Sequence, residues 1–219
     1  MKRRILLWGS LVVAMVIIGT IMIQIADREE PVQVPETEST ETPEVREIFE
    51  IRENDWIRGN PDADLIIVKY SDFQCPACRF YASFDNQISS EYADEVLFVR
   101  RYFPLSSFQF SRLAAKYAEA AGRQGKFWEM HDLLYINQHV WSGGGAETIF
   151  QNFADSLDLD SEQLQTDLLD PAIQERIESD YQDGRTLGIR GVPTIYVRGE
   201  QVSLPNSLDA YRSLIESKL

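Results

Sequence analysis

The pattern of apolar and polar positions predicts strands and helices in a definite order along the chain. Continuous apolar runs at residues 65–70 and 96–99 predict two strands that are buried on both faces. Between these runs, Phe80, Phe84 and Ile88 recur every four residues, which predicts a helix that ends near residue 93. The first part of the pattern therefore reads strand, helix, strand.

Further helical patterns follow the second strand. They cover about residues 107–121, 127–135, 147–157, 161–169 and 170–188. Asp170 and Pro171 open the last of them, because Asp is a good N-cap residue and Pro suits the first helical position.

The pattern returns to strands near the C-terminus. Residues 195–197 and 201–204 predict two strands joined by a turn, and residues 207–218 predict a closing helix. The complete order describes an α/β sheet that is interrupted in its middle by a helical insertion at about residues 106–187.

The N-terminal segment, residues 1–26, has the composition of a membrane anchor. Three basic residues precede an uncharged stretch from residue 5 to 26, which as a helix would be about 33 Å long and would cross a bilayer core. A cleavable signal peptide is the alternative, but its apolar region is normally only ~7–15 residues. Basic residues precede this stretch and acidic residues follow it, which predicts that the N-terminus lies inside the cell and that the residues after the anchor lie outside the cell membrane.

Residues 27–51 are rich in Glu, Thr and Pro and poor in large apolar side chains. Such a composition cannot bury enough surface to order itself, so it predicts a disordered linker. The remaining residues, 52–219, have the length of one domain. The formal net charge of −14 argues against a nucleic-acid partner.

Cys75 and Cys78 are the only cysteines in the sequence, and they stand just after the first predicted strand of the domain. A C-x-x-C pair that opens a helix after a strand is typical of a redox site of the thioredoxin type. Pro76 presets the helical φ at the first helical position. Free N–H groups at the helix N-terminus then favour a thiolate at Cys75.

Two other interpretations of the cysteine pair remain. A zinc site usually has four ligands, so His131 and His139 would have to complete it, and their spacing is unlike the usual short one. A purely structural disulfide across so short a loop would gain little closure entropy. A redox-active pair is therefore the favoured interpretation, with no metal and no cofactor.

Several separated motifs resemble the DsbA-like branch of the thioredoxin superfamily. They occupy residues 59–63, 70–78, 101–105, 125–132 and 187–194 in the same order as in that branch, and the likeness covers most of residues 56–217. The resemblance implies a thioredoxin-like fold with an inserted helical subdomain, and thiol–disulfide exchange as the activity.

The resemblance also implies roles for particular residues. Pro193 matches a cis-proline that faces the cysteines, and Val192 would offer its backbone to a substrate peptide. Ala77 replaces the histidine of the strongest oxidants, so one source of thiolate stabilisation is missing. Lys69 stands where many relatives carry a buried acid; its charge could stabilise the thiolate, or it could point to solvent. Asp72 is a further residue that could tune the cysteines.

These features predict an extracytoplasmic thiol–disulfide oxidoreductase that introduces disulfides into exported proteins through Cys75 and Cys78. We expect cysteine-containing exported proteins as substrates and a quinone-linked membrane protein as the reoxidising partner. The same residues could serve a disulfide reductase or isomerase, which differ in redox potential. An alternative of another class is a redox-inert binding or chaperone-like module.

Overall fold

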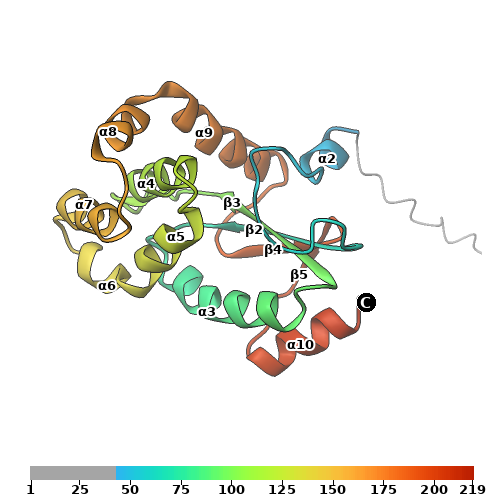
Figure 1. Cartoon of the computed structure of the whole chain (residues 1–219). Helices are drawn as coiled ribbons and strands as arrows, with labels where there is room; N and C mark the ends of the chain where they lie inside the picture. The colour runs from blue at the N-terminus through green and yellow to red at the C-terminus, as the bar shows by residue number, and fades with distance from the viewer. Residues whose placement is uncertain (1–42) are drawn as a thin grey trace, which may run out of the picture. The chain divides into compact units, whose positions relative to one another are not determined.

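The computed structural model describes residues 43–219, and Figure 1 shows how their helices and strands are arranged. Along the chain these elements are α2 (Pro43–Ile48), β1 (Trp56–Gly59), β2 (Leu65–Ser71), α3 (Pro76–Glu91), β3 (Val96–Tyr102), α4 (Ser111–Arg123), α5 (Phe127–Ile136), α6 (Gln138–Trp141), α7 (Ala146–Ser156), α8 (Ser161–Leu169), α9 (Pro171–Thr186), β4 (Thr194–Val197), β5 (Glu200–Val202) and α10 (Leu208–Glu216).

The strands form one mixed sheet in the order β1-β3-β2-β4-β5. Its central pair, β2 and β3, is parallel, with Ile67 opposite Phe98, and the other neighbours pair antiparallel. All seven residues of β3 are buried, and in β2 only Ile66 is partly exposed. The prediction that both strands are covered on both faces is therefore confirmed.

Helices cover the two faces of this sheet. On one face, Ile88 of α3 and Tyr211 of α10 pack against Ile67 and Ile195 in one apolar cluster. On the other face, a second cluster contains Tyr70 and Tyr196, with Tyr181 of α9 packed against it. Figure 1 shows the same layers, with α3 and α10 on one side of the strands and α9 on the other.

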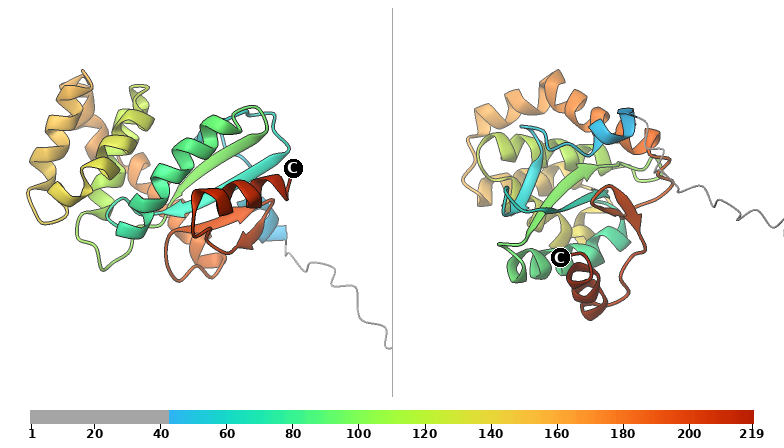
Figure 2. Two further views of the ribbon diagram at one scale, coloured as in Figure 1. Left: turned by 90° about the horizontal axis from the view of Figure 1, so that it is seen from below. Right: turned by 90° about the vertical axis from the view of Figure 1, so that its right-hand side faces the viewer.

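Helices α4 to α9 all lie between β3 and β4 in the chain, as the predicted insertion requires. Helices α4 to α8 gather beside one end of the sheet, which is visible in the left view of Figure 2. Alanines on α4 are buried, which lets the neighbouring helices approach closely. The α/β architecture with an inserted helical part is therefore confirmed.

Residues 43–51 differ from the linker predicted for them, because they contain α2 and pack against the sheet. Ile48 is buried, and the ring of Phe49 packs at a tilt against that of Tyr196, with 5.0 Å between the ring centres. The guanidinium of Arg101 donates to the carbonyls of Ile48 and Glu50. One aliphatic and one aromatic side chain, Ile48 and Phe49, are thus enough to order the C-terminal end of the acidic stretch, because the core supplies an apolar surface and a buried hydrogen-bond donor.

Arg101 itself is held by a buried ion pair. Its Nη2 lies 2.9 Å from Oδ2 of Asp55, and both side chains are fully buried. Arg176 of α9 reaches the other oxygen of Asp55 at 3.1 Å. Strand β1, which starts at the next residue and which the sequence pattern did not predict, is fixed at the sheet edge by this network.

The predicted membrane anchor, residues 1–26, lies outside the described residues. Within residues 43–219, the structure contains no helix with the length and apolar character needed to cross a membrane.

Candidate active site

The two cysteines lie where strand β2 passes into helix α3. Strand β2 ends at Ser71, a tight turn follows, and Cys75 is the N-cap residue of α3 with an extended backbone (φ −75°, ψ 121°). Pro76 begins the helix, and the N–H of Arg79 donates to the carbonyl of Cys75 at 3.1 Å. The predicted strand, turn and helix are all observed.

The two cysteines are free thiols in this structure and differ in burial. Cys75 retains 6% of its surface exposed, whereas Cys78 retains 0%. The sulfur of Cys75 lies 3.5 Å from the carbonyl oxygen of Val192, and the N–H of Asp72 donates to the sulfur of Cys78 at 3.5 Å. Of the two sulfurs, Cys75 is therefore the one that another molecule can reach.

The pKa values of the two thiols move in opposite directions. The hydrogen bond from the Cys78 thiol is the main cause that lowers the pKa of Cys75 to about 6, and the backbone N–H groups of Cys78 and Ala77 add to it. Burial is the main cause that raises the pKa of Cys78 well above its ordinary value. At neutral pH the site therefore contains a thiolate at Cys75 beside a protonated thiol at Cys78.

The loop before β4 faces the cysteines. The peptide bond between Val192 and Pro193 is cis, as the resemblance implied. Val192 packs against the apolar cluster that contains both cysteines, and its carbonyl oxygen lies beside the Cys75 sulfur. The fold therefore brings Pro193 and Val192 to the start of α3 across 117 residues of sequence.

Asp72 organises the turn before the cysteines. Its Oδ1 accepts from the N–H of Gln74 at 2.7 Å and from the hydroxyl of Ser111 at 2.6 Å, and its Oδ2 accepts from the N–H of Leu105 at 2.8 Å. Burial raises the pKa of Asp72, while these bonds oppose the rise. The negative charge of Asp72 works against the Cys75 thiolate, so its place in the site is mainly structural.

Lys69 lies inside the protein, not at a solvent-facing strand end. It is 6% exposed, and its ammonium forms an ion pair with Asp85 of α3. Burial outweighs every other influence on the pKa of Cys78, and the positive charge of Lys69 opposes that rise. The charge of Lys69 therefore acts on the inner sulfur of the pair.

Comparison with known proteins agrees with this geometry. A family model described as thioredoxin matches residues 52–217, which is most of the chain. The chain belongs to the thioredoxin family. Its resemblance to the DsbA-like oxidoreductase branch is confirmed by the architecture, the cysteine pair at the helix start and the solved structures that it matches.

Two solved structures and one curated protein are among those to which this chain is similar. A thioredoxin-like oxidoreductase from Silicibacter pomeroyi DSS-3 is 28% identical, with a TM-score of 0.66 over 76% of this chain and 93% of that one. DsbA1 of Wolbachia pipientis has the same fold at 18% identity, with a TM-score of 0.70 over 79% of this chain and 94% of that one. The Na(+)/H(+) antiporter NhaA 1 of Mycobacterium sp. (strain KMS) is 34% identical over 154 residues, which are 68% of this chain.

This chain spans about a quarter of the length of the curated antiporters that it matches, 24% for the Mycobacterium protein. The matched part therefore corresponds to one portion of those longer proteins.

Gln138 is a site residue that the sequence pattern did not reveal. From helix α6 its amide donates to the carbonyl of Phe73 at 2.7 Å and to the carbonyl of Cys75 at 2.9 Å. The amide of Gln74 donates to the carbonyl of Ser142 at 3.3 Å. These bonds tie the cysteine turn of this thioredoxin-family chain to its helical insertion.

Proposed function

We propose that this chain is a protein thiol–disulfide oxidoreductase that introduces disulfides into exported proteins. One observation carries the proposal: Cys75 is slightly exposed with a pKa lowered to about 6, mainly by its bond from Cys78, while Cys78 is fully buried with a raised pKa. Such an asymmetric pair has one sulfur for contact with a substrate and one that remains inside.

The reaction begins from the oxidised form, in which Cys75 and Cys78 share a disulfide. A substrate thiolate attacks the Cys75 sulfur, the bond between the two cysteines breaks, and Cys78 leaves and takes up a proton. A second substrate thiolate then attacks the substrate sulfur of the mixed disulfide, and Cys75 leaves as a thiolate. The substrate loses two electrons and gains a disulfide, and the enzyme becomes a dithiol.

The loop that contains Val192 and Pro193 is suited to hold the substrate during this exchange. The carbonyl of Val192 lies 3.5 Å from the Cys75 sulfur in the dithiol form. An extended peptide that pairs with this backbone would carry its cysteine directly beside Cys75.

The low pKa of Cys75 favours oxidation of the substrate. A thiol of pKa about 6 is about nine-tenths ionised at pH 7, whereas a thiol of pKa 9.0 is about one hundredth ionised. This ionisation stabilises the dithiol form by about 1.4 kcal/mol, which raises the reduction potential by about 30 mV. We therefore expect a reduction potential above the roughly −270 mV of thioredoxin. We expect it to stay below the roughly −120 mV of DsbA, because this chain has Ala77 in place of the histidine of the strongest oxidants.

The uncharged segment at residues 5–26 and its basic start support a location at the cell membrane with the thioredoxin-like domain outside. Disulfides persist in that compartment. A membrane protein linked to quinones would then accept the two electrons from the dithiol and restore the disulfide between Cys75 and Cys78.

Oxidation of a reduced model protein by the full chain tests the proposal. The variant Cys75→Ser should abolish it, and Ser83→Ala, on the exposed side of the same helix, should leave it unchanged. Retained oxidation in Cys75→Ser refutes the mechanism. A reduction potential at or below that of thioredoxin, measured against glutathione, points to a disulfide reductase. If a Cys75→Ala, Cys78→Ala double variant still performs the function of the protein in vivo, the chain is a redox-inert binding module.

A further inference from the structure

Arg100 is a buried cation whose hydrogen-bond donors find no partner in the described part of the chain. It is 4% exposed, and no described residue forms a hydrogen bond with its three guanidinium nitrogens. Burial raises the pKa of the nearby Tyr135 hydroxyl, and the charge of Arg100 opposes that rise. Several cations form ion pairs within residues 43–219, Arg58, Lys69 and Arg101 among them, but none of these pairs includes Arg100. A buried charge that is neither paired nor hydrogen-bonded is strongly unfavourable, so a missing partner is expected beside it.

The neighbours of Arg100 make its charge harder to accommodate. In the parallel pair of β2 and β3, Lys69 is the residue directly opposite Arg100. Like charges opposite each other on one face of a sheet repel. Lys69 has Asp85 as its counterion. Arg100 forms no ion pair within the described residues, and the carboxylate of Asp72 acts on its charge only from beyond ion-pair distance.

Aromatic rings cover the guanidinium of Arg100 but do not satisfy its donors. Its Cζ lies 3.9 Å from the ring centre of Phe73 and 4.6 Å from that of Tyr102. A ring attracts the charge through its face. The N–H groups lie in the plane of the guanidinium and are left for an acceptor that is not a ring.

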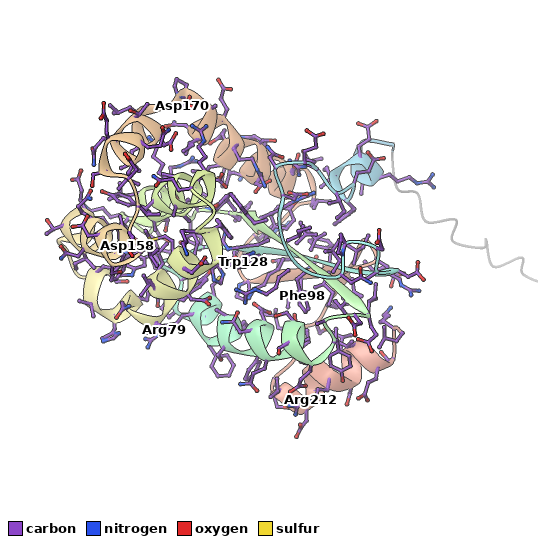
Figure 3. All side chains as sticks on the ribbon, in the orientation of Figure 1. Arg79, Phe98, Trp128, Asp158, Asp170 and Arg212 are labelled. Atoms are coloured by element: carbon purple, nitrogen blue, oxygen red, sulfur yellow. The ribbon has the colours of Figure 1, made fainter. Side chains whose placement is uncertain are left out.

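A cavity of about 30 Å³ lies beside Arg100. Three cations, Arg58, Lys69 and Arg100, and a single carboxylate, Asp85, are among its lining residues. Trp128 on α5 and Phe98 on β3 also line it, and Figure 3 labels both. Since roughly 10–15 Å³ is enough for one water, the cavity has room for one or two bodies of about that size.

His131, which also lines the cavity, adds no positive charge at neutral pH. Burial is the main cause that lowers the pKa of His131 to about 3, and its Nδ1 lies 2.8 Å from Oδ1 of Asp132. Water alone in the cavity would accept hydrogen bonds from Arg100 but would not neutralise its charge. A small anion would do both.

We propose that the cavity beside Arg100 binds one small monovalent anion of halide size, such as chloride, between strand β3 and helices α3 and α5. The anion accepts hydrogen bonds from the guanidinium and serves as the counterion that the fold does not supply. The proposal concerns a site separate from the cysteine pair and does not depend on the direction of electron flow.

Thermal unfolding of the full chain tests the site, with sodium chloride exchanged for sodium gluconate at constant ionic strength. A ligand that binds only the folded state raises the melting temperature until it saturates. We expect a saturable rise with chloride in the unmodified protein, and no such rise in Arg100→Met. The control Arg112→Met removes an arginine that is 47% exposed and also stacks on a ring, and it should keep the chloride response.

A crystal grown or soaked in sodium bromide gives a second readout, which remains available if Arg100→Met fails to fold. We expect an anomalous peak within hydrogen-bond distance of Arg100. Equal melting temperatures in chloride and gluconate, a chloride response that persists in Arg100→Met, or only ordered water beside Arg100 in the bromide crystal would each overturn the proposal.

Discussion

Replacement of Cys78 by alanine tests which group keeps the pKa of Cys75 low. The Cys78 thiol is the largest cause, and it acts together with the backbone N–H groups of Cys78 and Ala77 against the opposing effect of burial. Alanine removes the thiol donor and leaves the helix and its N–H groups in place. Serine at the same position keeps a donor, so Cys78→Ser is the matched control.

The size of the effect follows from the strength of one hydrogen bond. A hydrogen bond to a charged group contributes about 1.5–3 kcal/mol, and a change of one pH unit in a pKa corresponds to about 1.4 kcal/mol. We expect the pKa of Cys75 to rise by about one to two pH units in Cys78→Ala and by less in Cys78→Ser. The ionised fraction at pH 7 would then fall from about nine-tenths to between about one half and one tenth.

The pH dependence of alkylation measures this pKa, because iodoacetamide reacts with the thiolate and not with the thiol. Each variant of the full chain has a single cysteine, so its titration has one midpoint. If Cys78→Ala reacts with the midpoint of the unmodified protein, the N–H groups at the helix start hold the thiolate without help. An equal rise in Cys78→Ser and Cys78→Ala would show that packing around the thiol, not its hydrogen bond, is responsible.

Three further predictions concern stability. Cys75 is ionised above pH about 6 in the folded dithiol protein but only above about 9.0 in the unfolded one, so the unfolded state binds more protons between these pH values. The folded dithiol form should therefore gain up to about 1.4 kcal/mol of stability per pH unit in this window and lose it towards pH 6. Urea unfolding should show this pH dependence in the reduced form and not in the oxidised form. Gln138→Leu leaves two buried carbonyls without a donor and should cost about 1–3 kcal/mol in urea unfolding, whereas an unchanged midpoint would show that water replaces the amide. Arg101→Met leaves Asp55 with a single cationic partner and should cost about 3–5 kcal/mol, with faster proteolysis within residues 43–51; equal proteolysis rates would contradict its role in holding that segment.

The elements that could be predicted are those with a signal in consecutive residues. Strand β2, the turn with Cys75 and the start of α3 are specified within a dozen positions, by an apolar run, a cysteine pair and Pro76. The start of α9 is as local, since the carboxylate of Asp170 accepts from the N–H of Ala172 at 2.9 Å. Periodicity and caps act over one or two turns, which is the range that such patterns can reveal.

The features that could not be predicted depend on contacts between distant residues. Helix α2 lies in an acidic stretch, and it is ordered by Arg101, about 50 residues later in the chain. The burial of Lys69 depends on Asp85, which supplies its counterion from another element. Gln138 reaches Cys75 across 63 residues of sequence. No local sequence pattern predicts these contacts, because each of these polar residues is of a type that usually lies on the surface.

The difference between the two sulfurs is a consequence of where they stand on helix α3. Cys75 is the N-cap residue, so free N–H groups face it, while Cys78 is one turn inside. Residues three apart share a helix face, which brings the sulfurs together. Both belong to the apolar cluster with Phe73 and Tyr135, but only Cys78 is fully buried there. Ala77 supports the thiolate through its backbone N–H, which any residue except proline would provide. The order of the two pKa values follows from the burial of Cys78, which raises its pKa, and from the hydrogen bond of its thiol to Cys75, which lowers the pKa of Cys75.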